Sequence, residues 1–215
     1  YPDNYFDLAI VDPPYGIGAG TNAIGGDFGN FGKRAQRAKS VVSKKWDGSA
    51  PNADYFREVR RVSKNQIIWG ANYFAEHLPP SMGWIFWDKG VEMKGRCFSE
   101  GELAFSSFDR ALRIFVADPK DKDRIHPTQK PQALYRWLLK NYAKQGDRIL
   151  DTHVGSASSL VVYEEMGFEY VGFELDPDYY RDSCKRLEAF RAQPKLFSGG
   201  EIFQASKLPE QGSLF

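Results

Sequence analysis

The chain has 215 residues and a mass of 24.4 kDa, which suits one large domain or two small ones. Apolar residues make up 42% of the sequence and aromatic residues 15%, so the chain can build a sizeable core and is not a disordered polymer. A net charge of +1 excludes a uniformly basic coat for nucleic acid and leaves only local clusters of positive charge.

The first half of the chain predicts a strand, a long loop, a helix and three more strands. The apolar run Leu8–Val11 is typical of a buried parallel strand, and Asp12 with two prolines ends it. Residues 16–50 are rich in Gly, Lys and Arg and lack periodicity, which favours a mobile, functional loop. After it come apolar positions at helical spacing (Tyr55, Phe56, Val59, Val62), strands at 66–70, 84–87 and 103–105, and a charged, irregular stretch at 109–125.

The second half alternates helices and strands. Leu134, Trp137, Leu138 and Tyr142 mark a helical face, with Pro131 suited to the first turn and Gly146 to the C-terminal cap. We then expect a strand at 148–151, a loop at 152–158, a helix at 159–166, a strand at 170–174, a last helix carrying Tyr180, Cys184, Leu187 and Arg191, and a tail at 198–215. This alternation predicts a single α/β sandwich with a mixed, largely parallel sheet.

The tetrapeptide Asp12-Pro13-Pro14-Tyr15 directly follows the first predicted strand. In open α/β sheets, ligands bind at the carboxyl ends of strands. Asp12 supplies a carboxylate acceptor, the prolines stiffen the turn and leave the Pro13 carbonyl as a second acceptor, and Tyr15 supplies a flat face. Two acceptors beside an aromatic face suit a planar group with an exocyclic amine. The alternative is a rigid turn that only caps the strand.

A second loop, Asp151–Ser158, joins a predicted strand to a helix, and Glu174 ends the next strand. A Gly-containing turn after a strand, followed by an acidic residue on the next strand, is typical of nucleoside binding in Rossmann-like sheets. The turn has one glycine, Gly155, which favours a nucleoside cofactor smaller than a dinucleotide. An ordinary connection between strand and helix is the alternative.

These two motifs, together with His126-Pro127-Thr128-Gln129-Lys130-Pro131 between them, resemble the permuted β-class DNA amino-methyltransferases. The resemblance runs from about Asp7 to Arg191. It implies a Rossmann-like methyltransferase fold in three layers and S-adenosylmethionine as cofactor. Two positions depart from the family pattern: His153 stands where Phe is usual, and Ala157 where Gly is frequent.

The resemblance also implies roles for individual residues. Asp12 and Pro13 would hold the target amine, and Tyr15 would stack on a flipped base. Asp151 and Gly155 would lie against the methionine part of the cofactor. The full cofactor-binding set that we predict is Asp151, His153, Gly155, Ser156, Glu174, Thr128 and Lys130.

Asp before Pro-Pro-Tyr favours, by resemblance, methylation of adenine N6 in DNA, as in restriction–modification systems. Cytosine N4 methylation and a catalytically silent DNA-binding protein are the alternatives. A nicotinamide-dependent oxidoreductase would need a Gly-rich pyrophosphate turn, which the sequence lacks. An RNA substrate also stays open. The chemistry requires no metal.

Other segments suggest partners. A basic cluster in the loop at 16–50 can contact DNA phosphates, and the stretch at 109–125 would be a short target-recognition insert. The cluster consists of Lys33, Arg34, Arg37, Lys39, Lys44 and Lys45. The tail residues Gln211–Phe215 resemble a peptide that docks on the bacterial sliding clamp, and the family resemblance allows a homodimer.

The remaining candidates have simpler interpretations. Trp69, Asn72, Tyr73, Trp87, Asp88 and Lys89 lie near predicted strand ends, but core packing explains Trp69 and Trp87 better. The two cysteines, Cys97 and Cys184, indicate small buried residues in a reducing cytoplasm. No apolar run approaches the roughly 18 residues that span a bilayer, so we expect no membrane segment.

Overall fold

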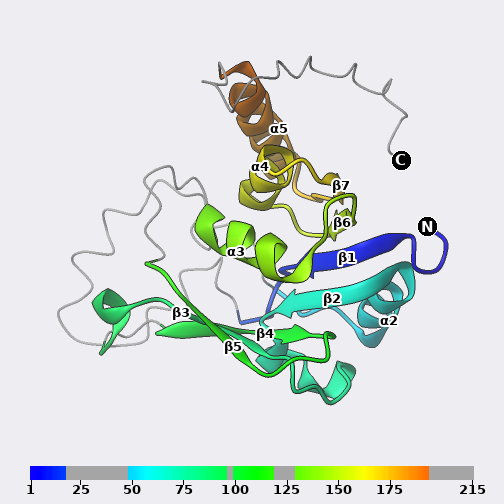
Figure 1. Cartoon of the computed structure of the whole chain (residues 1–215), viewed down its shortest axis with the longest axis vertical. Helices are drawn as coiled ribbons and strands as arrows, with labels where there is room; N and C mark the ends of the chain where they lie inside the picture. The colour runs from blue at the N-terminus through cyan, green and yellow to red at the C-terminus, as the bar shows by residue number, and fades with distance from the viewer. Residues whose placement is uncertain (18–47, 96–98, 119–128, 194–215) are drawn as a thin grey trace.

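The computed structural model describes residues 1–17, 48–95, 99–118 and 129–193 (Figure 1). Within these residues the strands form one seven-stranded sheet in the order β5-β3-β4-β2-β1-β6-β7. The strands are β1 (Phe6–Val11), β2 (Ser63–Trp69), β3 (Ile85–Asp88), β4 (Gly101–Ser106), β5 (Arg113–Val116), β6 (Arg148–Asp151) and β7 (Glu169–Gly172). The helices are α2 (Ala53–Val62), α3 (Gln132–Tyr142), α4 (Ser158–Glu165) and α5 (Pro177–Ala192), with 3-10 turns η3 (Ala71–Tyr73), η4 (Ala75–His77) and η5 (Val91–Met93).

The sheet is mixed and mostly parallel, as predicted. Strand β1 pairs in parallel with β2 on one side and with β6 on the other, and only β4 runs antiparallel to its neighbours β2 and β3. The register places Leu8 beside Ile149 and Ala9 beside Leu150. The carboxyl ends of β1 and β6, which carry the two predicted motifs, therefore lie at the same edge of the sheet.

Residues of the central strand β1 contribute to a core on each face of the sheet. Leu8 and Ile10 pack in the cluster that includes α3, α4 and α5, whereas Phe6, Ala9 and Val11 pack in the cluster that includes α2. Figure 1 shows α3, α4 and α5 on one side of the sheet and α2 on the other. Trp69 and Trp87 are fully buried, which confirms that they are core residues.

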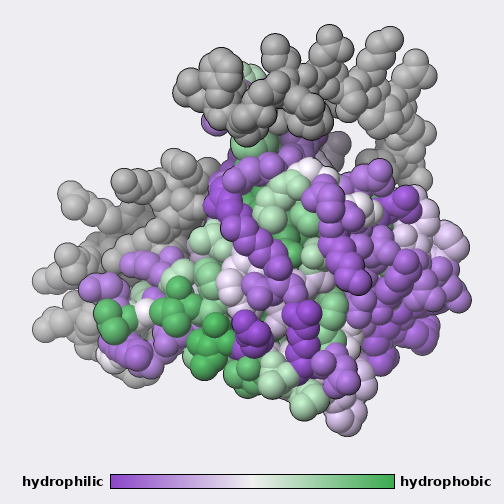
Figure 2. Space-filling view, viewed as in Figure 1, coloured by the Kyte–Doolittle hydropathy of each residue, from purple (hydrophilic) through white to green (hydrophobic). Residues whose placement is uncertain are grey.

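Strand β5 corrects the expectation that residues 109–125 are irregular. It is a four-residue edge strand, and its side chains Ile114 and Val116 are 58% and 64% exposed. Figure 2 shows hydrophobic residues gathered at the end of the molecule that β3, β4 and β5 form. A short strand whose apolar side chains face outward gives a weak sequence signal, because buried strands are recognised by their continuous apolar character.

Three local expectations also differ from the structure. Helix α3 ends with Ala143 as its cap, and Gly146 instead serves the following turn with a φ of +90°. Strand β7 ends at Gly172, two residues before Glu174. Cys184 is only partly buried and is a free thiol, whereas Cys97 lies outside the described residues.

None of the helices in the described ranges combines the length and apolarity needed to cross a lipid bilayer.

Candidate active site

A single cavity of about 1170 Å³ joins the two predicted motifs. Asp12, Pro13 and Tyr15 line one part of it, and the turn from Thr152 to Ser156 lines another. Glu174 and the residues after it complete the wall beyond β7. The carboxyl ends of β1, β6 and β7 thus supply the site, as expected for an open α/β sheet.

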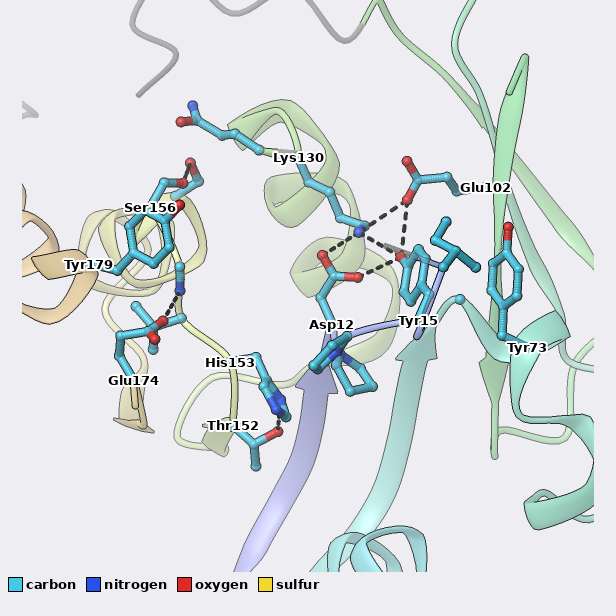
Figure 3. Close-up of a pocket in the computed structure, with 18 of the residues that line it drawn as sticks. Asp12, Tyr15, Tyr73, Glu102, Lys130, Thr152, His153, Ser156, Glu174 and Tyr179 are labelled. Atoms are coloured by element: carbon cyan, nitrogen blue, oxygen red, sulfur yellow. Dashed lines mark hydrogen bonds and ion pairs between the residues drawn. The ribbon is translucent and has the colours of Figure 1, made fainter. Parts of the chain in front are cut away.

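The catalytic tetrapeptide is held by a compact network of polar contacts (Figure 3). The Tyr15 hydroxyl donates a hydrogen bond to Oδ1 of Asp12 at 2.7 Å. The Lys130 ammonium lies 2.5 Å from Oδ2 of Asp12 and 3.1 Å from a carboxylate oxygen of Glu102. Lys89 pairs with the other oxygen of Glu102 at 2.8 Å. Carboxylates and ammonium groups therefore alternate along this wall.

Burial and charge together set the protonation states in this network. Burial opposes the charge of Glu102, but Lys130 and Lys89 outweigh burial and lower the pKa of Glu102 to about 2. Burial likewise opposes the charge of Lys130, yet Asp12 and Glu102 raise its pKa above the usual value. Burial and the neighbouring carboxylates hold the pKa of Tyr15 well above 10, so its hydroxyl remains a donor.

The ring of Tyr15 is enclosed by two neighbours from the turn after β2. Tyr73 stacks on it with ring centroids 5.1 Å apart and an interplanar angle of 18°. Gly70 has a φ of +68°, and a Cβ built there would lie 2.1 Å from the Tyr15 ring. The absence of a side chain at position 70 therefore lets the Tyr15 ring lie against the backbone.

The turn after β6 forms the second half of the cavity. The Asp151 carboxylate is buried and accepts hydrogen bonds from the Ser159 hydroxyl at 2.6 Å and from the backbone N–H of His153 at 3.0 Å. Glu174 accepts from the backbone N–H of Gly155 at 2.8 Å and from that of Asp176 at 2.9 Å. A Cβ added to Gly155 would meet no atom within 4 Å, so the turn borders open space.

His153 belongs to a polar chain behind this turn. The Tyr55 hydroxyl and the Thr152 hydroxyl are 2.7 Å apart, and the Thr152 hydroxyl is 2.9 Å from Nδ1 of His153. Burial lowers the pKa of His153 to about 4, so the imidazole is neutral at pH 7. Burial raises the pKa of Asp151 to about 6, although its hydrogen bonds to Ser159 and His153 act in the opposite direction.

Helix α5 anchors the turn through Arg186. Its guanidinium donates to the backbone carbonyl of Ser156 at 2.8 Å and to the Ser158 hydroxyl at 3.0 Å. Ala157 follows with a φ of +56°, so this residue occupies the left-handed region where the family resemblance expects a glycine. Arg186 was not predicted as a site residue, since a lone arginine on an amphipathic helix carries no motif.

The structure thus brings together most of the predicted site residues. Asp12, Pro13, Tyr15, Lys130, His153, Gly155, Ser156 and Glu174 all line the cavity. Asp151 lies buried beneath it, and the candidates Tyr73 and Lys89 line it as well. Lys130, predicted to help close the cofactor site, lines the cavity with its ammonium in contact with Asp12 and Tyr15.

Other predicted residues cannot be placed. Thr128 and the basic cluster Lys33, Arg34, Arg37, Lys39, Lys44 and Lys45 lie outside the described residues, as does the tail segment Gln211–Phe215. Glu102 was missed because a single Glu directly before a predicted strand has no recognisable spacing to its partners. Across the described ranges, no three His, Cys, Asp or Glu side chains are grouped so as to hold a metal ion.

A mixed seven-stranded sheet with its site at the carboxyl ends of β1, β6 and β7 defines the class of Rossmann-like methyltransferase folds. The crystal structure of the M1.HpyAVI–SAM complex has this fold, with a TM-score of 0.55 and 18% sequence identity over 86% of this chain and 90% of that chain. This likeness concerns the fold alone.

Sequence comparison gives the family. Residues 85–185 match the sequence model of the N6/N4 methyltransferase family, whose description is "DNA methylase". The chain is 41% identical to the Type II methyltransferase M2.DpnII of Streptococcus pneumoniae, over 85% of this chain and 82% of that protein. It is 32% identical to the DNA adenine methyltransferase YhdJ of Escherichia coli (strain K12), over 42% of this chain and 33% of that protein. The chain therefore belongs to the N6/N4 family of DNA methylases.

Proposed function

We propose that this protein transfers a methyl group from S-adenosylmethionine to the N6 amine of adenine in DNA. One observation carries the proposal: a single cavity contains both an amine-accepting tetrapeptide, Asp12–Tyr15, and a nucleoside-binding turn with its acidic residue, Glu174. Membership of the DNA methylase family and the similarity to a DNA adenine methyltransferase support adenine as the target.

The residues around the turn after β6 fit the cofactor. Each oxygen of Glu174 accepts one backbone N–H, which leaves further lone pairs to accept hydrogen bonds from ribose hydroxyls. The open space beside Gly155 allows a ligand to approach the backbone. Asp151 and Ser156 complete the side that would face the methionine portion. When bound there, S-adenosylmethionine supplies an electrophilic methyl group on a sulfonium.

The tetrapeptide activates the amine by accepting hydrogen bonds from its N–H groups. An adenine amine is a poor nucleophile because its lone pair is delocalised into the ring. Asp12, whose two oxygens are fixed by Tyr15 and Lys130, and the carbonyl of Pro13 offer acceptors that favour a tetrahedral nitrogen. Preorganised acceptors of this kind stabilise the transition state more than the ground state.

The base must leave the helix to reach the cavity. Unpairing and unstacking cost a few kcal/mol, and stacking on an aromatic side chain returns roughly 1–3 kcal/mol per base. Tyr15 and the half-exposed Tyr73 supply stacked aromatic faces at the cavity wall. Cytosine N4 is the second candidate target, because its amine has the same chemistry and the family description covers N6 and N4 methylation.

The direct test is transfer of labelled methyl from S-adenosylmethionine to duplex DNA, followed by nucleoside analysis. We expect N6-methyl-2′-deoxyadenosine, and Asp12→Ala should lower the rate by about 100- to 1000-fold, as loss of a preorganised contact to the reacting group does. Cofactor binding, measured by calorimetry, should persist in Asp12→Ala. The surface substitution Asp54→Ala, which removes an exposed carboxylate from α2, should leave both properties unchanged.

N4-methylcytosine as the product would reassign the target base, and methylation of RNA in preference to DNA would reassign the polymer. Near-normal turnover by Asp12→Ala would remove Asp12 from the mechanism.

The basic cluster from Lys33 to Lys45 supports DNA contact by charge alone, because six cations occur there without an acidic residue. Replacing all six by Ser should weaken DNA binding and flatten its dependence on salt, since each phosphate contact releases counterions. Fluorescence anisotropy at several salt concentrations measures both effects. An unchanged salt slope would mean that the cluster is simply solvated.

We also propose that residues 109–125 contribute to target recognition.

DNA as substrate favours a cytoplasmic location. The family resemblance supports a homodimer, which light scattering can test.

The segment Gln211–Phe215 supports docking on the sliding clamp. Clamp binding that persists after deletion of residues 211–215 would contradict the second proposal.

A further inference from the structure

We propose that Lys130 is a positioning residue for methyl transfer: together with Glu102 it fixes the Asp12 carboxylate as a charged hydrogen-bond acceptor for the target amine. This inference rests on the proposed function. It assigns to Lys130 a role on the amine side of the cavity, in place of the cofactor-side role that the family resemblance implies.

The geometry around the ammonium supports this assignment (Figure 3). A lysine ammonium has three N–H donors. Three oxygens surround the Lys130 nitrogen: Asp12 at 2.5 Å, Glu102 at 3.1 Å and the Tyr15 hydroxyl at 3.3 Å. The side chain is 2% exposed, and its nitrogen lies 5.2 Å from the centre of the Trp69 ring. The ammonium is therefore directed at the tetrapeptide and is shielded from solvent.

These contacts fix Asp12 from two sides. Lys130 holds Oδ2, and the Tyr15 hydroxyl holds Oδ1. Each carboxylate oxygen has two acceptor sites, so one site on each oxygen remains for the amine hydrogens. Without Lys130, only the hydrogen bond from Tyr15 would orient this carboxylate. A displacement of about 1 Å at a reacting group can lower the rate about 100-fold.

The charges around Lys130 explain why Glu102 belongs to the same positioning network as Lys130. Lys89, Glu102, Lys130 and Asp12 alternate in sign along the wall, so their formal charges cancel. The counter-charges of Asp12 and Glu102 keep Lys130 ionised despite its burial. A buried ion pair is weak evidence for a role in stability, because well-packed apolar residues often replace such pairs without loss. Positioning is therefore the better explanation for a fully enclosed ammonium at the catalytic tetrapeptide.

The test compares three variants of the full chain. Lys130→Met removes the cation and leaves one excess negative charge. Lys130→Met combined with Glu102→Gln removes the cation but restores charge balance. Lys130→Arg keeps the charge with a different shape. Lys64→Met is the matched control, since Lys64 forms an exposed ion pair with Asp7 far from the cavity wall. Measurements are kcat, cofactor affinity by calorimetry, and unfolding in urea.

We expect Lys130→Met and the double variant to lose about 100-fold in kcat at saturating substrates. Cofactor affinity should stay within about threefold, and Lys130→Arg should retain more activity than Lys130→Met. Lys64→Met should change none of these properties.

Two results would overturn the inference. Normal kcat in the charge-balanced double variant would reduce the network to a structural ion pair, and this variant remains informative if Lys130→Met alone fails to fold. Lost cofactor affinity with normal kcat at saturation would return Lys130 to the cofactor side. An unmodified chain that transfers no methyl to DNA would instead overturn the proposed function, and with it this inference.

Discussion

Asp151 and His153 lie two positions apart and respond to pH in opposite senses. The pKa of Asp151 is raised to about 6, so its contribution to stability is complete at low pH and is lost as pH rises toward 6. The pKa of His153 is lowered to about 4, so the unfolded chain takes up a proton below pH 6.5 while the folded chain does not. The His153 contribution is therefore lost as pH falls from 6.5 to 4.

Each of the two shifts corresponds to about 3 kcal/mol, and the two pH windows nearly coincide. The two contributions of Asp151 and His153 therefore cancel much of each other's effect on how stability depends on pH. This compensation gives a physical role to the histidine at a position where the resemblance expects phenylalanine.

His153→Phe should remove one of the two opposing contributions. Relative to the unmodified chain, the variant should gain about 3 kcal/mol in the free energy of unfolding as pH falls from 7 to 4. Urea denaturation at several pH values measures this gain. His77→Phe serves as control, because this histidine lies on the partly exposed turn η4. A stability difference between His153→Phe and the unmodified chain that is independent of pH would show that His153 titrates normally.

Ala157 shows how the second departure from the family pattern is tolerated. Its left-handed backbone costs roughly 1–2 kcal/mol for a residue with a side chain. Its methyl group is fully buried in the core, which contributes about 0.8 kcal/mol, and alanine avoids the roughly 0.5–1 kcal/mol of extra chain entropy that glycine loses. These contributions are of similar size, so alanine is acceptable where glycine is the more frequent choice.

The turn between β2 and η3 acts as a unit with the catalytic tyrosine. Gly70 receives Tyr15 against its backbone, and the next turn stacks Tyr73 on the Tyr15 ring. The backbone N–H of Gly70 donates to the carbonyl of Leu103, which ties the turn to β4. Glu102, the partner of Lys130, is adjacent on the same strand. One turn therefore couples the aromatic and the charged parts of the site.

Gly70→Ala tests this coupling. It adds both backbone strain and a clash with the Tyr15 ring, so we expect a loss of about 2–4 kcal/mol in unfolding free energy, together with slower methyl transfer. Gly95→Ala is the control. Gly95 has a φ of +70°, close to that of Gly70, but a Cβ there would meet nothing within 4 Å, so only the backbone strain of about 1–2 kcal/mol should remain. Equal losses in both variants would mean that the Tyr15 contact is unimportant.

The predictability of each element followed its burial. Strands β1, β2 and β6 each contain buried apolar residues in succession (Leu8–Val11, Ile67–Trp69 and Ile149–Leu150) next to Pro, Gly or Asp, and these runs predict the strands. Strand β5 was not predicted, because it lies at the edge of the sheet and its outward residues pack against nothing that would fix their type. The charged residues around it therefore resemble a loop.

At the scale of the whole molecule, the meeting of Asp12 with the Gly155 turn was predictable from topology. Both follow parallel strands, and parallel strands end at a common edge. The position of Lys130 was not predictable in the same way. It precedes α3 in an irregular segment, and its contacts with Glu102 on β4 and Asp12 after β1 depend on how three distant elements pack. The order of motifs along the chain predicts which loops lie close together. It does not predict which side chains in those loops contact one another.

The adjacency of β1 and β6 has a consequence for biosynthesis. β1 emerges from the ribosome before β2 and can pair with it when β2 is made, but the other edge of β1 has no native partner until β6 follows much later in the chain. At usual translation rates this interval is on the order of ten seconds. An unpaired, apolar strand edge is prone to association with other chains. Newly made chains should therefore depend on chaperones until β6 has been synthesised.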